Sequence, residues 1–309
     1  MSNKSDINSG LAQGSLQGLK GGLGLSKMES GIKKGMANGI SRRDKVQDPA
    51  TMPIGKAPLI YWVADLFPEP ADATTVPAAS FPRLAGSATL TAAGNPVRRK
   101  GCGTKWFIDF DNATDLITSS STTGTRELTV FLVTRPCSTV ATDITIFSRL
   151  NNSFNQLGDL SVFITGSNKI AVRLSSAATT AANFVRYETP VLRDYSLING
   201  VKTGLAENEW FLVTMKFSMD RGLAIPQRDI EIYINGTISP ATLTNNTWNL
   251  EAGQNMPDVS CFFGNAAGGS NPSGAGAHLA AGLVFDYWLT NAEQLRIENF
   301  FRYYYGLGF

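Results

Sequence analysis

The C-terminal segment constrains the fold most, because an apolar strand pattern is followed there by a helix with both ends marked. Residues 281–289 are rich in Val, Phe, Tyr and Trp, which is typical of a buried strand. Thr290, with Glu293 three residues later, predicts a capping box, and Gly306 predicts the helix end. Apolar residues recur between these ends at helical spacing: Ile297, Phe300, Phe301 and Tyr304. We therefore expect a buried strand and a short helix packed near it.

Upstream, the sequence predicts a series of short strands separated by polar loops, with the clearest hairpin formed by residues 210–217 and 228–236. In its second strand Ile230, Ile232 and Ile234 alternate with polar residues, and Asn235-Gly236 is a strong turn signal. We expect further strands at residues 59–65, 128–134, 144–149, 160–165, 169–175, 184–188 and 261–264, and a strand ending in an acidic turn within 106–117. This pattern predicts an antiparallel β-sandwich over residues 51–309.

Several of these fragments resemble concanavalin A-like (laminin G-like) jelly-roll domains of phage and bacterial surface proteins. The resemblance is carried by residues 59–65, 106–117, 128–134, 210–236 and 282–307. It implies an all-β, antiparallel jelly-roll β-sandwich with one C-terminal α-helix, and it makes residues 106–117 a hairpin. It implies little chemistry, because that fold hosts lectins, glycosidases and purely structural modules.

Residues 1–50 differ in kind from the rest and predict an extended or partly helical N-terminal arm. They contain no aromatic residue, nine glycines and eight Lys/Arg against four Asp/Glu. Glycines and apolar residues stand four apart, close to one helical turn: Gly10, Gly14, Gly18, Gly31, Gly35 and Gly39, with Met28, Ile32, Met36 and Ile40. Such spacing favours an arm that orders along a partner protein, whereas a flexible basic tail is the alternative.

The composition excludes several functional classes. A net charge of +2 argues against a nucleic-acid binder driven by bulk charge. The three cysteines, Cys102, Cys137 and Cys261, are far apart and indicate neither a zinc ribbon nor a disulfide framework. No apolar run approaches the ~20 residues of a membrane span, and no signal peptide is recognisable.

Residues that could carry chemistry are few. His278 is the single histidine, and it stands in a Gly/Ala-rich stretch that predicts an exposed loop. Asp229 and Glu231 lack the third acid of a glycosidase motif and are expected on the solvated face of a strand.

Two other features suggest a ligand. The acidic turn with Asp109, Asp111, Asn112 and Asp115 would suit calcium, although an Asx-rich turn that binds its own backbone explains it more simply. Trp248 is a candidate glycan contact in a polar loop, with a lid on the core as the alternative.

These observations predict a non-enzymatic protein without a cofactor. The resemblance and the arm favour a structural component of a bacteriophage particle, either a capsid decoration or a tail, baseplate or fibre-associated protein. Residues 1–50 would bind other virion proteins, the protein would be a homo-oligomer in the particle, and assembly would occur in the bacterial cytoplasm. The alternative is a carbohydrate-binding adhesion module that recognises host surface glycans.

Overall fold

The computed structural model describes most of the chain from Asp48 onward. The described residues are 48–50, 52, 54–66, 74–76, 85–102, 105–112, 114–135, 143–150, 159–175, 184–192, 197–198, 201–202, 209–218, 230–246, 256, 258–264 and 277–308.

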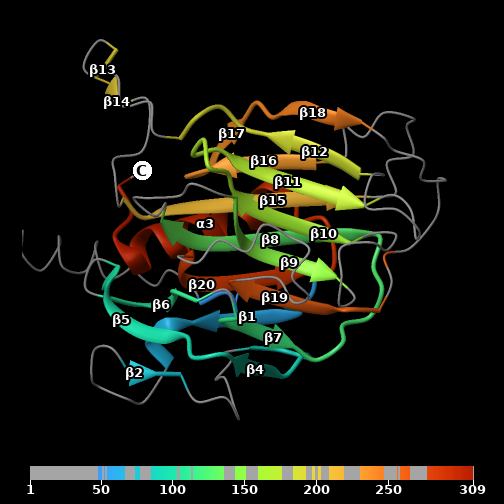
Figure 1. Cartoon of the computed structure of the whole chain (residues 1–309). Helices are drawn as coiled ribbons and strands as arrows, with labels where there is room; N and C mark the ends of the chain where they lie inside the picture. The colour runs from blue at the N-terminus through green and yellow to red at the C-terminus, as the bar shows by residue number, and fades with distance from the viewer. Residues whose placement is uncertain are drawn as a thin grey trace, which may run out of the picture. The chain divides into compact units, whose positions relative to one another are not determined.

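The described strands form two antiparallel sheets that pack face to face, which confirms the predicted β-sandwich (Figure 1). Sheet A runs in the order β17-β16-β15-β8-β20-β6-β5-β2, with β1 between β20 and β3. Its strands are β1 (Ile60–Val63), β2 (Thr74–Thr75), β3 (Ala85–Gly86), β5 (Val97–Cys102), β6 (Lys105–Phe110), β8 (Glu127–Arg135), β15 (Phe211–Ser218), β16 (Ile230–Ile234), β17 (Thr237–Ser239) and β20 (Ala277–Phe285).

Sheet B runs in the order β18-β12-β11-β10-β9-β19-β7-β4. Its strands are β4 (Leu90–Ala93), β7 (Leu116–Ser119), β9 (Ile144–Leu150), β10 (Leu160–Ile164), β11 (Ile170–Ser175), β12 (Phe184–Glu188), β18 (Thr242–Asn246) and β19 (Ser260–Gly264). A short 3₁₀ turn, η1 (Ala64–Leu66), follows β1, and β13 (Leu197–Ile198) pairs with β14 (Val201–Lys202) outside both sheets.

Strand β20 is the centre of sheet A, because it pairs with β8, β6 and β1. At Gly282 the two sheets are close together. A Cβ there would lie 2.5 Å from both the Phe263 and the Trp62 rings, so no side chain fits without displacing them. Those two rings meet edge to face, with centroids 5.4 Å apart, and join sheet A to sheet B.

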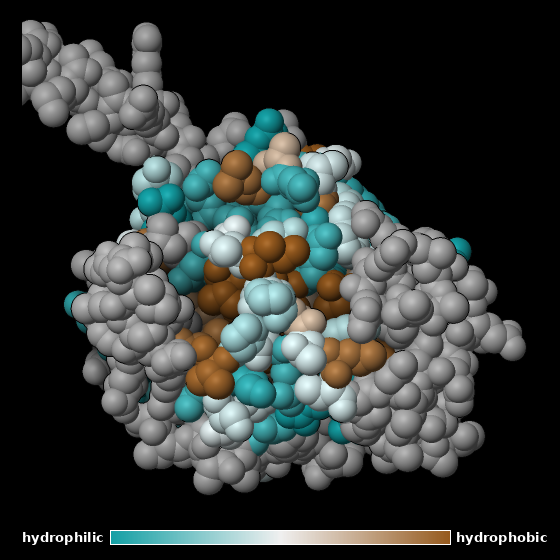
Figure 2. Space-filling model, turned by 90° about the horizontal axis from the view of Figure 1, so that it is seen from above, coloured by the Kyte–Doolittle hydropathy of each residue, from teal (hydrophilic) through white to brown (hydrophobic). Residues whose placement is uncertain are grey.

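The edge strands β17 and β18 lie on the same side of the sandwich and leave the core less covered there. Ile234 and Leu243 are only partly buried against the core at this edge, and Ile238 is 57% exposed. Figure 2 looks onto this side and shows apolar side chains gathered in the middle of the face, among hydrophilic ones. The Asn235-Gly236 turn that joins β16 to β17 has positive φ at both residues (52° and 74°), as its sequence predicts.

The C-terminal helix α3 (Asn291–Tyr305) packs on the outer face of sheet A. Its predicted caps are confirmed: Thr290 and Glu293 form the capping box, and Gly306 is left-handed (φ 64°). Its apolar stripe is buried at Ile297, Phe300 and Phe301, while Tyr304 is only partly buried. None of the described helices is long and apolar enough to cross a membrane.

A buried polar cluster also joins α3 to sheet A. The Thr214 hydroxyl and the Gln294 amide each donate to Glu298 Oε1 at 2.9 Å, and burial raises the pKa of Glu298. Lys216 is almost fully buried beside them. Its Nζ lies 3.3 Å from Glu231 Oε2 and 4.6 Å from the centre of the Trp288 ring. The helix is therefore fixed in register by specific polar contacts as well as by its apolar stripe.

Two sequence predictions about strands are wrong. Residues 106–117 do not form a hairpin, because β6 belongs to sheet A and β7 to sheet B, so the acidic turn between them crosses from one sheet to the other. The last strand begins at Ala277 and ends at Phe285, earlier than the predicted 281–289. Gly282 of this strand is needed because the Trp62 and Phe263 rings leave no room for a side chain there.

We predict that Phe301→Ala lowers the melting temperature of the full chain by about 6 °C or more. Phe301 is fully buried and packs on Phe131, with ring centroids 6.3 Å apart, and loss of such a ring costs about 3–5 kcal/mol. Tyr303→Ala is the matched control, because Tyr303 lies on the same helix and is 61% exposed. Equal shifts for the two variants, by differential scanning calorimetry, would show that α3 is not docked through this face.

Candidate functional site

The outer face of sheet B carries an ordered group of charged side chains. Strand alternation places them there, since Val162, Val172 and Tyr187 point into the core. Phe163, Arg173 and Arg186 occupy the opposite face on β10, β11 and β12. Of the described residues, the one α-helix lies on sheet A, so no described helix covers this surface.

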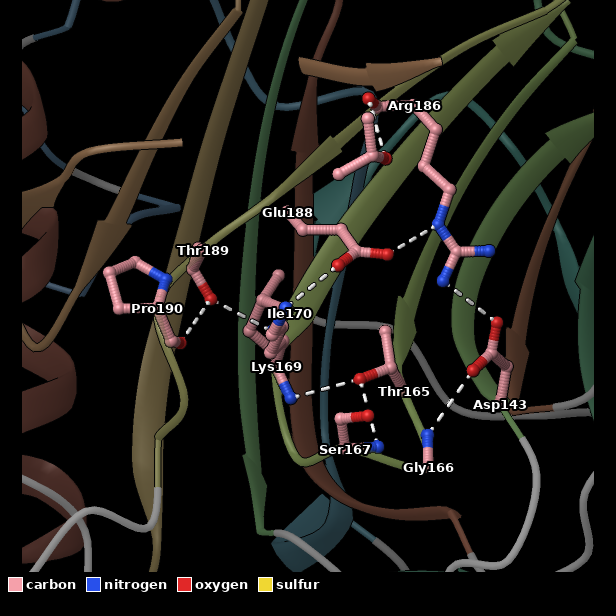
Figure 3. A network of polar contacts seen from close by, with 11 residues as sticks. Asp143, Thr165, Gly166, Ser167, Lys169, Ile170, Arg186, Glu188, Thr189 and Pro190 are labelled. Atoms are coloured by element: carbon pink, nitrogen blue, oxygen red, sulfur yellow. Dashed lines mark hydrogen bonds and ion pairs between the residues drawn. The ribbon is translucent and has the colours of Figure 1, made fainter. Parts of the chain in front are cut away.

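Arg186 is the centre of this surface network (Figure 3). Its Nε donates to Glu188 Oε1 at 2.8 Å, and its Nη2 donates to Asp143 Oδ2 at 3.1 Å. Lys169 Nζ donates to the other oxygen of Glu188 at 3.1 Å. The guanidinium also lies 4.7 Å from the centre of the Phe163 ring, which it covers. We call Asp143, Lys169, Arg173, Arg186 and Glu188 the sheet B network.

The turn between β10 and β11 holds one side of this network in place. Thr165 Oγ1 accepts the backbone N–H groups of Ser167 and Lys169, and Asn168 is in the left-handed region (φ 56°). The N–H of Gly166 donates to Asp143 Oδ1 at 3.2 Å, which ties the turn to the start of β9. Figure 3 shows these contacts converging on the same end of the sheet. A backbone contact thus holds Asp143, and Asp143 in turn holds Arg186, before any ligand arrives.

Arg173 stands directly opposite Arg186 in the β11–β12 register. Burial, and then the charge of Arg186, lower the pKa of Arg173 to about 10, so it remains charged at neutral pH. On its other side Arg173 is opposite Ser161 of β10. The two arginines thus lie on neighbouring strands near the β18 edge of this face.

The network is partly exposed, whereas Ser161 and Phe163 on the same face are buried, and its polar atoms have binding capacity left. The side chains of Glu188, Asp143, Arg186 and Lys169 are between 15% and 31% exposed. The contacts of Arg186 with described residues use two of five N–H donors, and the carboxylate oxygens can accept further hydrogen bonds. This surface can therefore bind a ligand rich in hydroxyl or carboxylate groups.

Sequence reasoning missed this site. The segment Phe184-Val-Arg-Tyr-Glu188 was predicted only as a strand, although its alternation already puts Arg186 and Glu188 on one face. The register that places Arg173 opposite Arg186 could not be read from the sequence.

The structure corrects the prediction that His278 lies in an exposed loop. It lies in β20 on the outer face of sheet A, and its side chain is 16% exposed. Arg135 Nε donates to His278 Nδ1 at 2.8 Å, so the ring proton must be on Nε2, which lies 3.0 Å from Asp109 Oδ1. Arg99 Nε donates to Asp109 Oδ2 at 2.6 Å. Both ring nitrogens are thus engaged, which leaves no basic nitrogen for a nucleophile.

Aromatic rings support this second cluster. The Arg135 guanidinium lies 4.8 Å from the centre of the Phe107 ring and 5.2 Å from that of Trp210. The Trp210 indole N–H donates to the Gly101 carbonyl oxygen at 2.8 Å. These contacts connect β6, β8, β20 and the start of β15, so the cluster has a structural role.

The acidic turn that could suit calcium binds its own backbone. Asp115 is buried and accepts the N–H of Asn95 at 2.7 Å and of Asn112 at 3.2 Å. Asp109 is held by His278 and Arg99, and so does not join the turn. Among the side chains that the structure describes, no group of three or more His, Cys, Asp or Glu is arranged to hold a metal ion.

Of the two acids Asp229 and Glu231, the structure describes Glu231. Glu231 accepts the Tyr233 hydroxyl at 2.8 Å and is paired with Lys216, so it is partly covered rather than simply solvated. Asp229 lies outside the described residues. So do Trp248, Cys137 and all of the predicted partner-binding positions of the arm. Cys102 and Cys261 are buried free thiols.

No protein-family model and no curated protein matches the sequence. Among solved structures, the binding domain of botulinum neurotoxin serotype G is 15% identical, with a TM-score of 0.48 over 71% of this chain and 48% of that chain. The binding domain of botulinum neurotoxin DC in complex with SialylT is 13% identical, with a TM-score of 0.48 over 76% and 52%. A heptameric SAP-like pentraxin from Limulus polyphemus is 16% identical, with a TM-score of 0.39 over 59% and 73%.

The chain thus spans about half the length of the neurotoxin domains that it matches. The similarity is too low to transfer a ligand or an activity. The choice of site therefore depends on the geometry described above.

We predict that Asp109→Asn destabilises the protein at pH 7 and that this difference disappears in acid. Burial alone would raise the pKa of Asp109, but its contacts with His278 and Arg99 outweigh burial and hold the pKa below 3.8. A lowered folded pKa gives stability that is present above 3.8 and is lost as pH falls through the folded value. Urea unfolding at pH 3–7 measures this.

Asp111→Asn is the control, because burial and its hydrogen bond to Asp115 raise the pKa of Asp111. It should not destabilise the protein at pH 7. If the free energy of unfolding of Asp109→Asn were lower than that of the wild type by the same amount at every pH, the carboxylate charge would contribute nothing to stability.

Proposed function

We propose that this protein is a non-catalytic carbohydrate-binding protein and that the sheet B network is its binding surface. The observation that carries the proposal is the pre-positioned set of Arg186, Glu188, Asp143 and Lys169 on an outer face that no described helix covers. A saccharide presents many hydroxyl groups, and each is both a donor and an acceptor. Fixed carboxylates and a planar guanidinium match such groups without much loss of side-chain entropy on binding.

The non-catalytic part of the proposal is supported by the state of the candidate catalytic groups. His278 is engaged at both nitrogens, and Glu231 is paired with Lys216 and Tyr233. Both side chains are thus already engaged by neighbouring described residues, whereas hydrolysis needs an available base or a pair of accessible acids.

The second candidate function is attachment to a bacteriophage particle through residues 1–50. The four-residue spacing of glycines and of apolar residues in the arm favours it. The two roles are compatible: the arm would hold the protein on other virion proteins, in several copies, while the sandwich binds glycans of the host surface.

We predict that the full chain binds a subset of saccharides on a glycan array and that Arg186→Lys weakens this binding about tenfold or more. Lysine keeps the charge but cannot bridge Asp143 and Glu188 with a planar fork. Arg302→Lys is the matched control, because Arg302 is exposed on α3, on the other sheet. A folded protein that binds no saccharide, or an Arg186→Lys variant with wild-type affinity, would refute the proposal.

For the arm, we predict that changes in residues 1–47 alter incorporation of the protein into particles. Removing residues 1–47 should abolish incorporation into particles, and replacing Gly31, Gly35 and Gly39 with Leu should nearly do so, because Leu blocks close approach of a partner. The same three positions changed to Ala should still assemble, since Ala is small. Copy number per purified particle measures the effect. Normal copy number without residues 1–47 would show that attachment lies elsewhere in the chain.

A further inference from the structure

Lys216 is buried between sheet A and the start of α3, where a lysine is costly. Its neighbours Met215 and Phe217 belong to the core, so strand alternation turns Lys216 to the outer face of the sheet. The start of α3 lies against it there, and its side chain is only 1% exposed. Burying a cation costs free energy even beside an acid, and an apolar residue of similar length would avoid that cost. A stabilising role alone therefore explains this lysine poorly.

The Lys216 amine faces an amide on one side and an acid on the other. Its Nζ donates to Asn291 Oδ1 at 3.4 Å and lies 3.3 Å from Glu231 Oε2. The centre of the Trp288 ring is 4.6 Å from the same nitrogen. Strand β15 supplies the amine, β16 supplies the acid directly opposite it in register, and α3 supplies the amide. An amine, a carboxamide and a group that can transfer protons thus meet at one point.

The helix determines the position of the amide. Asn291, Gln294 and Glu298 are spaced by three and four residues and so share the face of α3 that is turned to sheet A. Gln294 and Glu298 are buried on that face, and the hydroxyl of Thr214 on β15 donates to Glu298. The helix is therefore held against the same strand that carries Lys216, with its first residue, Asn291, at the amine.

We propose that Lys216 and Asn291 form an isopeptide bond and that Glu231 transfers the protons. The amide carbon is bonded to the oxygen that Nζ contacts, so a small movement of the lysine brings Nζ to the distance of about 3–3.5 Å at which attack occurs. Nζ bonds to Cγ, and the bond from Cγ to Nδ2 breaks. Two protons of the Lys216 ammonium pass through Glu231 to Nδ2, which departs as ammonium, and the third stays on the new amide. Nothing is oxidised or reduced, and no co-reactant is needed.

The surroundings favour this reaction and give it a structural consequence. Proton transfer from the ammonium to Glu231 replaces two charges with two neutral groups, which a buried position tolerates better. The product amide is neutral, so the buried cation is removed. The new bond joins β15 to the first residue of α3, 75 residues later in the chain. It closes a covalent loop, so the helix cannot leave sheet A completely even when its packing is lost.

Mass spectrometry of the full chain, unfolded after purification, tests the proposal. We expect the wild-type protein to be lighter than its sequence by one molecule of ammonia. Tryptic digestion should then give a branched peptide that contains both Lys216 and Asn291. A succinimide at Asn235, which precedes a glycine, would release the same mass, so the branched peptide is the deciding measurement.

Variants assign the role of each group. Asn291→Ala removes an exposed side chain and should fold, and it should lose both the mass change and the branched peptide, as should Lys216→Met. Glu231→Gln keeps the two reacting groups but should slow the release of ammonia about 100-fold or more, because it removes the proton transfer. Asn299→Ala is the matched control. Asn299 lies on the same helix, about 12 Å further along its axis, and its loss should leave the cross-link unchanged.

The outcomes that would overturn the proposal are distinct from those of the saccharide experiments. A folded wild-type protein with the full mass of its sequence and no branched peptide would overturn it. So would a branched peptide that joins a different pair of residues. A Glu231→Gln variant that forms the cross-link at the wild-type rate would also contradict it, since the acid would then have no part in the reaction.

Discussion

The close approach of the two sheets at Gly282 is the constraint on which the rest of the structure depends. The edge-to-face contact of Trp62 with Phe263 needs the space that Gly282 leaves. This contact joins the sheets at the strand that pairs with β8, β6 and β1. Because β20 leads directly into the capped helix α3, the same strand also directs the helix onto the outer face of sheet A.

That placement gives the two sheets different outer faces. Sheet A is covered by α3 through apolar packing and the buried contacts of Thr214, Lys216 and Glu298. Sheet B has no described helix over it, and its outer face carries charged side chains fixed by the β10–β11 turn and by the start of β9. The covering helix thus lies on one side of the sandwich, and the proposed binding surface lies on the other.

Local sequence signals predicted the sandwich, the β15–β16 hairpin, the Asn235-Gly236 turn and both caps of α3, because each depends on residues close in the chain. Features that depend on strand register, or on which sheet a strand joins, could not be predicted from the sequence. The Arg173–Arg186 pair needs the β11–β12 register, and the separation of β6 from β7 needs both sheets. The Ala- and Gly-rich neighbours of His278 have low strand propensity and so predict a loop, whereas the packing of Trp62 and Phe263 against β20 requires glycine at position 282.

Hydrogen–deuterium exchange of the full chain, with and without a saturating saccharide that it binds, tests directly whether the sheet B network is the binding surface. We expect slower exchange at the start of β9, at the β10–β11 turn and in β12, with α3 unchanged. Protection confined to α3, to the Asp109–His278 cluster or to residues 1–47 would contradict it, because the ligand would then bind away from the outer face of sheet B.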